Sequence, residues 1–411
     1  MKNILEIAEQ IKLNGGTLYL VGGAVRDKIL NRKVRDEDYC VVGISVEKFK
    51  KLFPEAKERG KSFCVFDIDK REFAIARKES KKGKGHKEFE IKANENITIE
   101  EDLARRDITI NAMAQNVLTG EIIDIFNGRE DLKKRIIRAT TTRFEEDPLR
   151  VYRVARFSSE LEFEVDEQTI NLMNKLKPEL ETLSKERIFE ELKKALKSNR
   201  PSIFFQILKK ANILDVHYKE INNLIGSLQP EEYHPEGDSY NHTMMVLDKA
   251  SEMTKKLEIR FSALVHDLGK GITPKEMYPH HYGHDINGVE LVEKLGKRIG
   301  VPKLWIKCGK LAAKEHMRAG MFNNMKPNKK VSFIEKIYKT QLGLEGLEIV
   351  VNADRARGDI YSKVEFAKIG NMCMKEINGK YIKQKYNVKS DKSFAQKLHE
   401  ERVKWLENNN M

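Results

Sequence analysis

Three consecutive acidic residues, Asp36-Glu37-Asp38, lead into the apolar segment YCVV. Side chains two residues apart on a β-strand point to the same face, so a strand DEDYCVV would bring the carboxylates of Asp36 and Asp38 together. Paired carboxylates bind Mg²⁺, which prefers oxygen ligands and keeps positions open for phosphate oxygens. Two such ions can activate a 3′-hydroxyl and stabilise a leaving pyrophosphate. Acids also alternate by chance on exposed strands, so the pair predicts a site for nucleotide transfer only together with the glycine segment that precedes it.

A glycine pair lies just upstream, in the segment LVGGAVRD at residues 20–27. A glycine turn at the start of a helix leaves backbone N–H groups free to approach a triphosphate. We expect Gly22 and Gly23 to act in this way, and Arg26 to bind the triphosphate through its guanidinium. A turn glycine followed by a surface charge on a helix is the alternative interpretation.

GGAVRD followed by DED resembles the signature of the class II nucleotidyltransferases, polymerase-β-like enzymes that include bacterial tRNA CCA-adding enzymes and bacterial poly(A) polymerases. DLARRDITINAMA, at residues 102–114, is similar to the second motif of this family, in which an arginine contacts ribose and phosphates. The resemblance implies this role for Arg106, with Asp107 and Asn111 as further candidates. Taken alone, Arg105, Arg106 and Asp107 would also fit an ion cluster at the end of a helix.

Two later segments resemble further motifs of the family: DIFNGREDLKKRIIR (124–138), a hinge between head and neck, and EDPLRVYRVARF (146–157). The resemblance implies that Asp147 and Arg150 present their hydrogen-bonding edges to the incoming base. A carboxylate accepts from an exocyclic amine, and a guanidinium donates to ring acceptors. CTP and ATP both carry an amine beside a ring nitrogen, so these side chains could select them without a nucleic-acid template.

Two more arginines, Arg153 and Arg156, follow Arg150 at helical spacing, so the three can share one helix face. We expect Arg153 and Arg156 to bind the triphosphate. A solvated basic stripe is the alternative.

Histidines and aspartates recur in the second half of the chain in the order H…HD…H…H…D. This order resembles the HD phosphohydrolase superfamily, and the resemblance implies a bound divalent ion that generates a hydroxide for attack at phosphorus. Imidazole and carboxylate ligands suit Ni²⁺, Co²⁺ or Mn²⁺. The expected ligands, with His266 and Asp267 as the central pair, are His242, His266, Asp267, His284, His316 and Asp354.

Several residues of this half have a second interpretation. A buried ion pair within a helix would also explain His266-Asp267. Lys270 could contact a substrate phosphate or lie at the end of a helix. His280 and His281 stand in a polar turn, which is why His284 and His316 are the preferred additional ligands.

The composition adds a charge argument. The chain of 411 residues has a net charge of +13, which favours polyanionic partners, although a generally basic composition would give the same value. The four cysteines lie far apart and form no CxxC, so neither a zinc knuckle nor a disulfide framework is predicted. The N-terminus does not resemble a signal peptide, and no apolar run approaches 18 residues. We therefore expect a cytoplasmic protein with no membrane partner.

The patterns predict an α+β fold in which a small mixed α/β head is followed by all-α parts. We expect residues 78–88 to form an exposed mobile loop and residues 229–242 to be a linker. The predicted domains are a nucleotidyltransferase head at 1–138, a helical neck and body for base selection and RNA binding at 139–228, an HD domain at 229–360 and a basic helical tail at 361–411.

Together, the motifs resemble the multifunctional CCA-adding proteins of bacteria. The resemblance implies addition or repair of the tRNA 3′-CCA end from CTP and ATP with Mg²⁺, in a monomer or homodimer. It also implies 2′,3′-cyclic phosphodiesterase, 2′-nucleotidase and phosphatase activity of the HD domain. The alternatives are a poly(A) polymerase, a partial A-adding or CC-adding enzyme, and a non-catalytic tRNA-binding protein.

Overall fold

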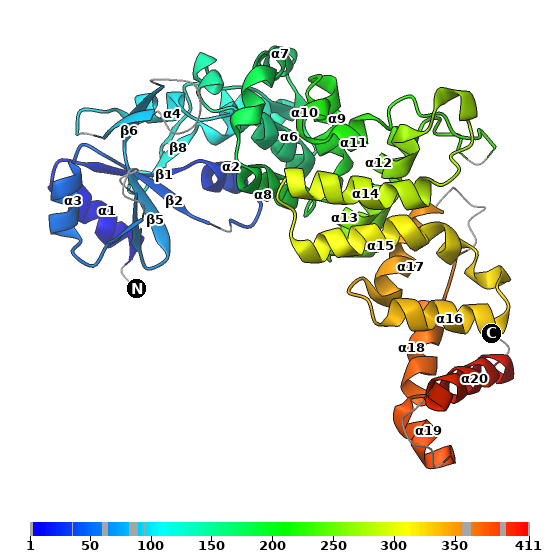
Figure 1. Ribbon diagram of the computed structural model, residues 1–411. Coiled ribbons are helices and arrows are strands. Elements are labelled where there is room, and N and C mark those ends of the chain that lie inside the picture. Colours follow the sequence, from blue (N-terminus) through cyan, green and yellow to red (C-terminus); the bar gives the residue numbers. More distant parts are fainter. Residues whose placement is uncertain are drawn as a thin grey trace. The chain divides into compact units, whose positions relative to one another are not determined.

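The protein forms two compact units in a computed structural model (Figure 1). The first unit comprises Met1–Arg187 with Gln206–Ile213, and the second comprises Ile188–Phe205 with Leu214–Met411. The division falls within helices α8 (Lys185–Ala195) and α9 (Ser202–Lys210). The residues that the structure describes are 3–34, 36–59, 65–81, 89–93, 95–232, 234–355, 363–386 and 392–409.

A seven-stranded sheet forms the core of the head in the first unit. Its strands, in spatial order, are β3 (Lys57–Arg59), β4 (Val65–Ile68), β5 (Arg71–Ile75), β2 (Asp38–Val42), β1 (Thr17–Val21), β8 (Ala114–Asn116) and β9 (Ile122–Ile123). β1 pairs antiparallel with both β2 and β8, whereas β2 pairs parallel with β5. The prediction of a mixed α/β head is confirmed.

Alternation along the strands separates two faces of this sheet. One face packs aromatic side chains under α1 (Ile4–Leu13) and α3 (Val46–Leu52), with the rings of Phe49 and Phe66 4.9 Å apart. The opposite face carries Val21 and Cys40, which pack with Leu103 of α4 (Ile99–Ala104). Asp38 lies two residues before Cys40 on the same strand, so its side chain belongs to this second face.

A separate two-stranded ribbon joins β6 (Arg77–Lys81) antiparallel to β7 (Phe89–Ala93). The prediction of a loop over residues 78–88 is wrong for residues 78–81, which belong to β6, and the rest of that range lies outside the described residues. A two-stranded ribbon needs no apolar face of its own, so a polar sequence does not distinguish it from a loop.

Helices complete the first unit. α2 (Gly23–Ile29) follows β1 directly, and α6 (Arg150–Leu161) is buried along most of its length. The remaining elements are α5 (Gly128–Lys134), α7 (Glu167–Lys175), and the short parallel pair β10 (Ile136–Ile137) and β11 (Glu164–Val165).

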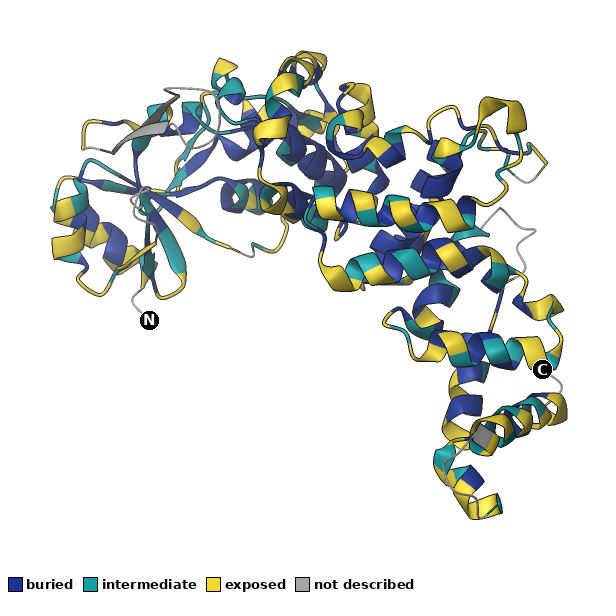
Figure 2. Cartoon of the chain, viewed as in Figure 1, coloured by how far each residue is buried: buried dark blue, intermediate teal, exposed yellow. Residues whose placement is uncertain are grey.

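In the second unit, the elements assigned among the described residues are all helices, apart from one isolated β-bridge between Leu228 and Asp238. Its central helix is α13 (Leu257–Val265), which is buried from Ile259 onward and contacts α12 (Ser239–Met253), α15 (Lys303–Gly320) and α17 (Gly343–Asp354) (Figure 2). The other helices are α10 (Leu214–His217), α11 (Lys219–Asn222), α14 (His284–Arg298), α16 (Pro327–Tyr338), α18 (Ala367–Glu376), α19 (Gly379–Tyr386) and α20 (Lys392–Asn408). Among the described helices of the whole chain, none is long and apolar enough to cross a membrane.

The boundaries expected from the sequence can be compared with the units. The first unit takes in the predicted head and much of the predicted neck, whereas residues 229–242, expected to be a linker, lie inside the second unit. There, Ser239 N–H donates to the carbonyl of Ser227, which ties the start of α12 to the preceding segment. The expected division of the chain into four domains stays a prediction.

Candidate active sites

Two carboxylates meet at the start of β2 and β5. Asp38 is the first residue of β2, and the register pairs it with Glu72 of β5. Burial raises the pKa of Asp38, and the charge of Asp36 raises it further while that of Arg106 lowers it. Asp38 in turn raises the pKa of Glu72, which burial raises most. Glu72 was not singled out from the sequence. It lies two residues before Ala74 in REFAI, so strand alternation puts its side chain on the same face of β5 as that of Ala74.

Asp36 does not lie on the strand as expected. β2 begins at Asp38, and Asp36 precedes it in irregular backbone, so strand alternation does not place the two carboxylates on one face. The pairing of β2 with β1 ends where Asp38 lies opposite Val21, the last residue of β1. Asp36 therefore lies beyond the ladder, and its effect on the pKa of Asp38 is what associates the two.

The glycine turn before α2 brings two predicted triphosphate ligands together. Gly22 has a φ of 71°, and a Cβ atom on it would lie 3.0 Å from Nη1 of Arg106. A Cβ on Gly23 would lie 3.4 Å from Nη2 of Arg26. Arg26 is buried, and its Nη1 donates to Oδ1 of Asn111 at 2.7 Å. The backbone of the turn thus lies directly against two guanidinium groups.

The segment DLARRD forms a buried ion cluster. The fully buried carboxylate of Asp102 accepts from Arg105 at 2.7 Å and from Arg106 at 3.1 Å. Burial works to raise the pKa of Asp102, but the two arginines outweigh it and the pKa is lowered. Nε of Arg106 is buried without a hydrogen-bond partner among the described residues. The ion cluster considered for these residues exists, and Asp102 orients Arg106 within it.

Asp107 links this segment to α6. Its Oδ2 accepts from Nε of Arg153 at 2.7 Å, and its Oδ1 accepts from Nδ2 of Asn111 at 3.4 Å. Burial opposes ionisation, but the charge of Arg153 outweighs it and the pKa of Asp107 falls to about 2. Asp107 is therefore charged at neutral pH and holds Arg153 in place.

Three of the predicted triphosphate ligands surround one aromatic ring. The Cζ atoms of Arg156, Arg26 and Arg153 lie 3.7, 5.4 and 5.5 Å from the ring centroid of Phe157. Arg156 also pairs with Glu160 at 2.7 Å. Because cation–π contacts attract guanidinium groups to the ring face, Phe157 can hold like charges close together. We call Arg26, Arg153, Arg156 and Phe157 the arginine cluster.

The residues expected to recognise the base make contacts within the protein. Oδ2 of Asp147 accepts from Nη2 of Arg187 at 2.7 Å. The guanidinium of Arg150 donates to the carbonyls of Arg105, at 2.6 Å, and Arg143. Arg187 was not predicted as a site residue because it lies 40 positions after Asp147 and only the fold brings them together.

In the second unit, five elements converge on Asp267. His266 and Asp267 follow the end of α13, and α12, α14, α15 and α17 supply the other side chains. Burial opposes protonation of His266, but the charges of Asp267 and Asp354 raise its pKa to about 10. The structure thus brings the six predicted HD residues together: His242, His266, Asp267, His284, His316 and Asp354.

Asp267 divides these residues into two groups. Its Oδ2 lies 3.3 Å from Nε2 of His266 and 3.8 Å from Nε2 of His242. Its Oδ1 lies 3.4 Å from Nε2 of His284 and 3.3 Å from Nε2 of His316. Each group could hold one ion. We call His242, His266 and Asp267, with Asp354 2.9 Å from His242, the first half-site, and Asp267, His284 and His316 the second half-site.

The donor atoms of both half-sites suit a metal. Nε2 of His266 and Oδ1 of Asp267 are buried and have no hydrogen-bond partner of good geometry among the described residues, whereas Oδ2 of Asp267 pairs with Lys270. Unsatisfied polar atoms in a protein interior are costly, and an ion would satisfy them. Imidazole nitrogens with carboxylate oxygens fit Ni²⁺, Co²⁺ or Mn²⁺.

The far nitrogen of each imidazole also has a partner. Nδ1 of His266 lies 2.8 Å from the carbonyl of Ala263, that of His284 lies 2.6 Å from the carbonyl of His281, and that of His316 lies 2.9 Å from the carbonyl of Ala313. Nδ1 of His242 lies 2.6 Å from Oε1 of Glu236. Glu236 was missed because HPEGDSYNH resembles a linker.

A close approach of two backbone segments sets the position of His284. A Cβ atom on Gly269 would lie 1.9 Å from the carbonyl oxygen of His284. This is far below any tolerable contact, so Gly269 must lack a side chain. Lys270, the next residue, has its Nζ 2.6 Å from Oδ2 of Asp267 and 2.7 Å from Oε1 of Gln229.

The other two histidines of PHHYGHD have different surroundings. His281 lies with Nδ1 2.9 Å from Oγ1 of Thr273 and Nε2 2.9 Å from the carbonyl of Leu228. The ring of His280 stacks on that of Tyr282, with centroids 5.7 Å apart. Neither belongs to a half-site.

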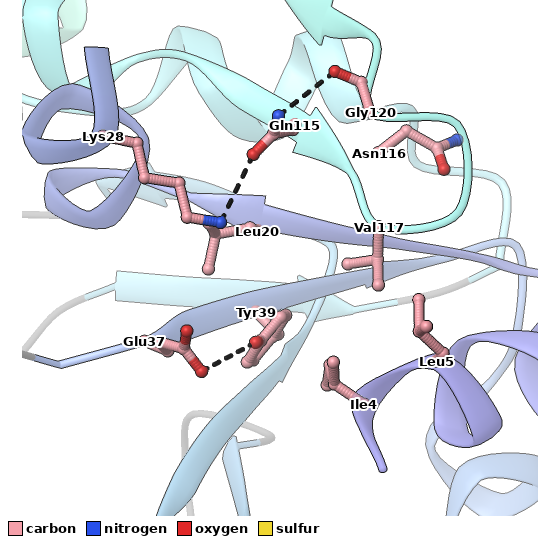
Figure 3. Close-up of a pocket in the computed structure, with 10 residues that line it drawn as sticks. All are labelled: Ile4, Leu5, Leu20, Lys28, Glu37, Tyr39, Gln115, Asn116, Val117 and Gly120. Atoms are coloured by element: carbon pink, nitrogen blue, oxygen red, sulfur yellow. Dashed lines mark hydrogen bonds between the residues drawn. The ribbon is translucent and has the colours of Figure 1, made fainter. Parts of the chain in front are cut away.

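A pocket of about 290 Å³ opens on the other face of the head sheet (Figure 3). Leu20, Tyr39 and Gln115 line it from three adjacent strands, and the hydroxyl of Tyr39 donates to Glu37 at 2.9 Å. The lining contains neither predicted metal ligands nor members of the arginine cluster.

Comparisons with known families identify three segments. Residues 18–138 match the poly A polymerase head domain. Residues 162–225 match the probable RNA and SrmB-binding site of polymerase A, and residues 239–349 match the HD domain.

Solved structures of similar fold include a CCA-adding enzyme in complex with ATP, with a TM-score of 0.65 and 19% identity over 98% of this chain and 90% of that chain. The Thermotoga maritima CCA-adding enzyme complexed with tRNA_CCA has a TM-score of 0.66 and 21% identity over 98% and 91%. A CCA-adding enzyme with CTP has a TM-score of 0.65 and 21% identity over 98% and 89%. The chain therefore joins a poly A polymerase head domain to an HD domain, in the fold of CCA-adding enzymes, as the resemblance of its motifs predicts.

Proposed function

We propose that the first unit is a tRNA nucleotidyltransferase that adds or repairs the 3′-terminal CCA from CTP and ATP without a nucleic-acid template. The proposal rests on the place of Arg106. Arg106 lies against the glycine turn, acts electrostatically on the Asp38 carboxylate, and is followed by Asp107, which pairs with Arg153 of the arginine cluster. Similar folds that bind tRNA, ATP and CTP support it.

The carboxylates fit Mg²⁺ because they offer only oxygen donors. Asp36, Asp38 and Glu72 would hold the ions. When bound, Mg²⁺ would lower the pKa of the RNA 3′-hydroxyl and balance charge on the pyrophosphate. The triphosphate would be held by the backbone N–H of Gly23 and by Arg26, Arg106, Arg153 and Arg156.

Base selection would use Asp147 and Arg150. The carboxylate would accept from the exocyclic amine of cytosine or adenine, and the guanidinium would donate to ring acceptors. The contact from Arg187 fixes the orientation of Asp147, so the carboxylate would meet the base at a fixed angle. The side chains of Asp147 and Arg150 would thus select the nucleotide in place of a nucleic-acid template.

The tRNA would be recognised mainly by its charge, its backbone shape and its single-stranded end. The net charge of +13 and the match of residues 162–225 to an RNA-binding family support this proposal. The basic residues of 361–411 would add to the same attraction. Because tRNA and nucleoside triphosphates are cytoplasmic, we propose that location.

We further propose that the HD domain is a metal-dependent phosphohydrolase acting on 2′,3′-cyclic phosphates, 2′-nucleotides and phosphate esters. The two half-sites that share Asp267 support it. A bound transition-metal ion would supply hydroxide for attack at phosphorus. Lys270, 2.6 Å from Asp267, would bind a substrate phosphate beside it.

The test of the first proposal is incubation of tRNA lacking CCA with each nucleoside triphosphate alone and with all four, followed by sequencing of the 3′ ends. We expect C, C and A in order. Asp38→Ala should erase incorporation while leaving tRNA binding, and Glu47→Ala, an exposed acid on α3, should change neither. Runs of A without C would instead identify a poly(A) polymerase, and addition of only CC, or of only one A, would identify a partial enzyme.

The test of the second proposal uses the same protein with a 2′,3′-cyclic nucleotide. His266→Ala should abolish hydrolysis and spare CCA addition. Loss of both activities in a folded variant would contradict two independent sites.

A further inference from the structure

We propose that Glu236 is a positioning residue that makes the first half-site bind its ion more tightly than the second. The inference rests on the proposed metal-dependent function of the HD domain. Nδ1 of His242 faces a carboxylate, whereas Nδ1 of each of the other three histidine ligands faces a backbone carbonyl.

Glu236 is well placed to act on His242. Its Oε1 lies 2.6 Å from Nδ1 of His242, and its side chain is 8% exposed. The same oxygen lies 3.0 Å from Nδ1 of His234, whose ring packs edge-on against that of His242 at a centroid distance of 4.7 Å. Nδ2 of Asn241 donates to the carbonyl of Glu236 at 3.3 Å. Two imidazoles thus contact the carboxylate, and Asn241 contacts the backbone of the same residue.

An ionised carboxylate can only accept hydrogen bonds, so Nδ1 of His242 carries the hydrogen that it donates to Glu236. With Nδ1 protonated, the lone pair for an ion is on Nε2. Nε2 points into the first half-site, 2.9 Å from Asp354 and 3.8 Å from Asp267. Glu236 therefore fixes both the tautomer and the ring orientation that metal binding needs.

The other ligands have weaker support. Nδ1 of His266, His284 and His316 face backbone carbonyls, which orient a ring but carry no net charge. A full negative charge at 2.6 Å makes the imidazole of His242 a stronger electron donor. The first half-site also contains Asp354, whereas the second has only its share of Asp267. Both differences favour the first half-site.

The same atoms could in principle hold an ion outside the half-sites, because donor atoms of His234, Glu236 and His242 lie within 4.8 Å of one another. Such an ion would need the lone pair of His242 Nδ1 and would take the hydrogen bond from Glu236. The short contact between Nδ1 and Oε1 favours the hydrogen bond. A third bound ion in the experiment below would overturn the proposal.

The experiment titrates Co²⁺ into the metal-free full-length chain by calorimetry and by visible absorption of the bound ion. The Asp38→Ala background keeps the head carboxylates from adding a site. We expect two ions, one tight and one weak, with His284→Ala removing the weak one. Glu236→Gln keeps an acceptor but removes the charge, and should weaken only the tight ion, by about 10- to 100-fold. Glu232→Gln, an exposed acid on the same segment, should bind as the parent does.

The outcomes separate the inference from the proposed function. A parent chain that binds no Co²⁺ at the half-sites would contradict the phosphohydrolase proposal itself. Two ions whose affinities are unchanged in Glu236→Gln, or weakened equally at both positions, would overturn the role of Glu236. Glu236→Ala supplies a second measurement, since loss of the acceptor as well as the charge should weaken the tight ion further than Glu236→Gln does.

Discussion

The guanidinium of Arg156 lies over the ring of Phe157, with Cζ 3.7 Å from the ring centroid. Arg26 of α2 and Arg153 of α6 approach the same ring, although these two helices are far apart in the sequence. One aromatic side chain thus gathers three guanidinium groups, each also paired with a carboxylate, in the region where the triphosphate is proposed to bind.

Phe157→Leu should therefore weaken nucleotide binding. A cation–π contact contributes about 0.5–2 kcal/mol, which corresponds to a rise in KM of about two- to thirty-fold. Because the ring acts through the arginines, KM should rise equally for CTP and ATP in steady-state incorporation assays. Phe163→Leu is the control, because it removes a similar contact outside the arginine cluster, in which Cζ of Arg135 lies 5.2 Å from the ring centroid of Phe163. Equal effects of the two variants would argue against a role of the ring in binding.

Arg187→Ala should reduce base selectivity, because Asp147 loses the donor that orients it. Loss of one charged hydrogen bond corresponds to about a tenfold fall in preference for CTP and ATP over UTP and GTP. Competition between the four nucleotides, read by sequencing of products, measures it. Lys175→Ala, which removes an exposed ion pair with Glu145, should keep the parent selectivity. Unchanged selectivity of Arg187→Ala would show that Asp147 needs no such support.

Gly22→Ala should impair incorporation beyond its effect on stability. Gly22 has a φ of 71° and Gly120 a φ of 75°, so alanine is strained at both, by about 1–3 kcal/mol. Only at Gly22 would the new Cβ also lie 3.0 Å from Arg106, whereas nothing lies within 4 Å of the Cβ at Gly120. Urea unfolding should show that Gly22→Ala and Gly120→Ala are both destabilised, and incorporation rates should show that only Gly120→Ala keeps its activity.

The free energy of unfolding should fall as the pH is lowered, because of His217. Burial, and then the charge of Arg298, lower the pKa of His217 to about 4. Between about pH 6.5 and 4, the unfolded chain binds a proton that the folded chain excludes, so acid favours unfolding in this window. His217→Gln should lose less stability than the parent between pH 7 and 5 in urea unfolding, and His280→Gln, an exposed histidine, should follow the parent. An unchanged slope in His217→Gln would assign the effect elsewhere.

Local patterns in the sequence predicted much of the fold. Apolar runs ending in glycine gave β1 and the turn into α2, and spacing of three and four gave α6. These succeed because alternation and helical period reflect burial of one face. Asp36 shows the limit of such patterns, since the strand begins two residues later than DEDYCVV suggests.

Contacts between distant segments could not be predicted in the same way. The order of the HD residues gave the six side chains but not their division between the two oxygens of Asp267, which depends on how α12, α14, α15 and α17 pack. Glu72 and Arg187 were missed for the same reason, whereas Glu236, six residues before His242, was missed because its segment resembles a linker. Strand register brings Glu72 close to its partner, and chain folding does so for Arg187. None of the three residues belongs to a motif that would predict its role.

The backbone contact at Gly269 allows His284 to reach Asp267, and the proposed second half-site depends on it. Any side chain there would push the first turn of α14 away and carry His284 out of reach of Asp267, while the first half-site kept its ligands. A chain with all six proposed ligands but alanine at the position of Gly269 should then hold a single ion. Counting histidines and aspartates in a relative would not reveal the difference, whereas the absence of this glycine would.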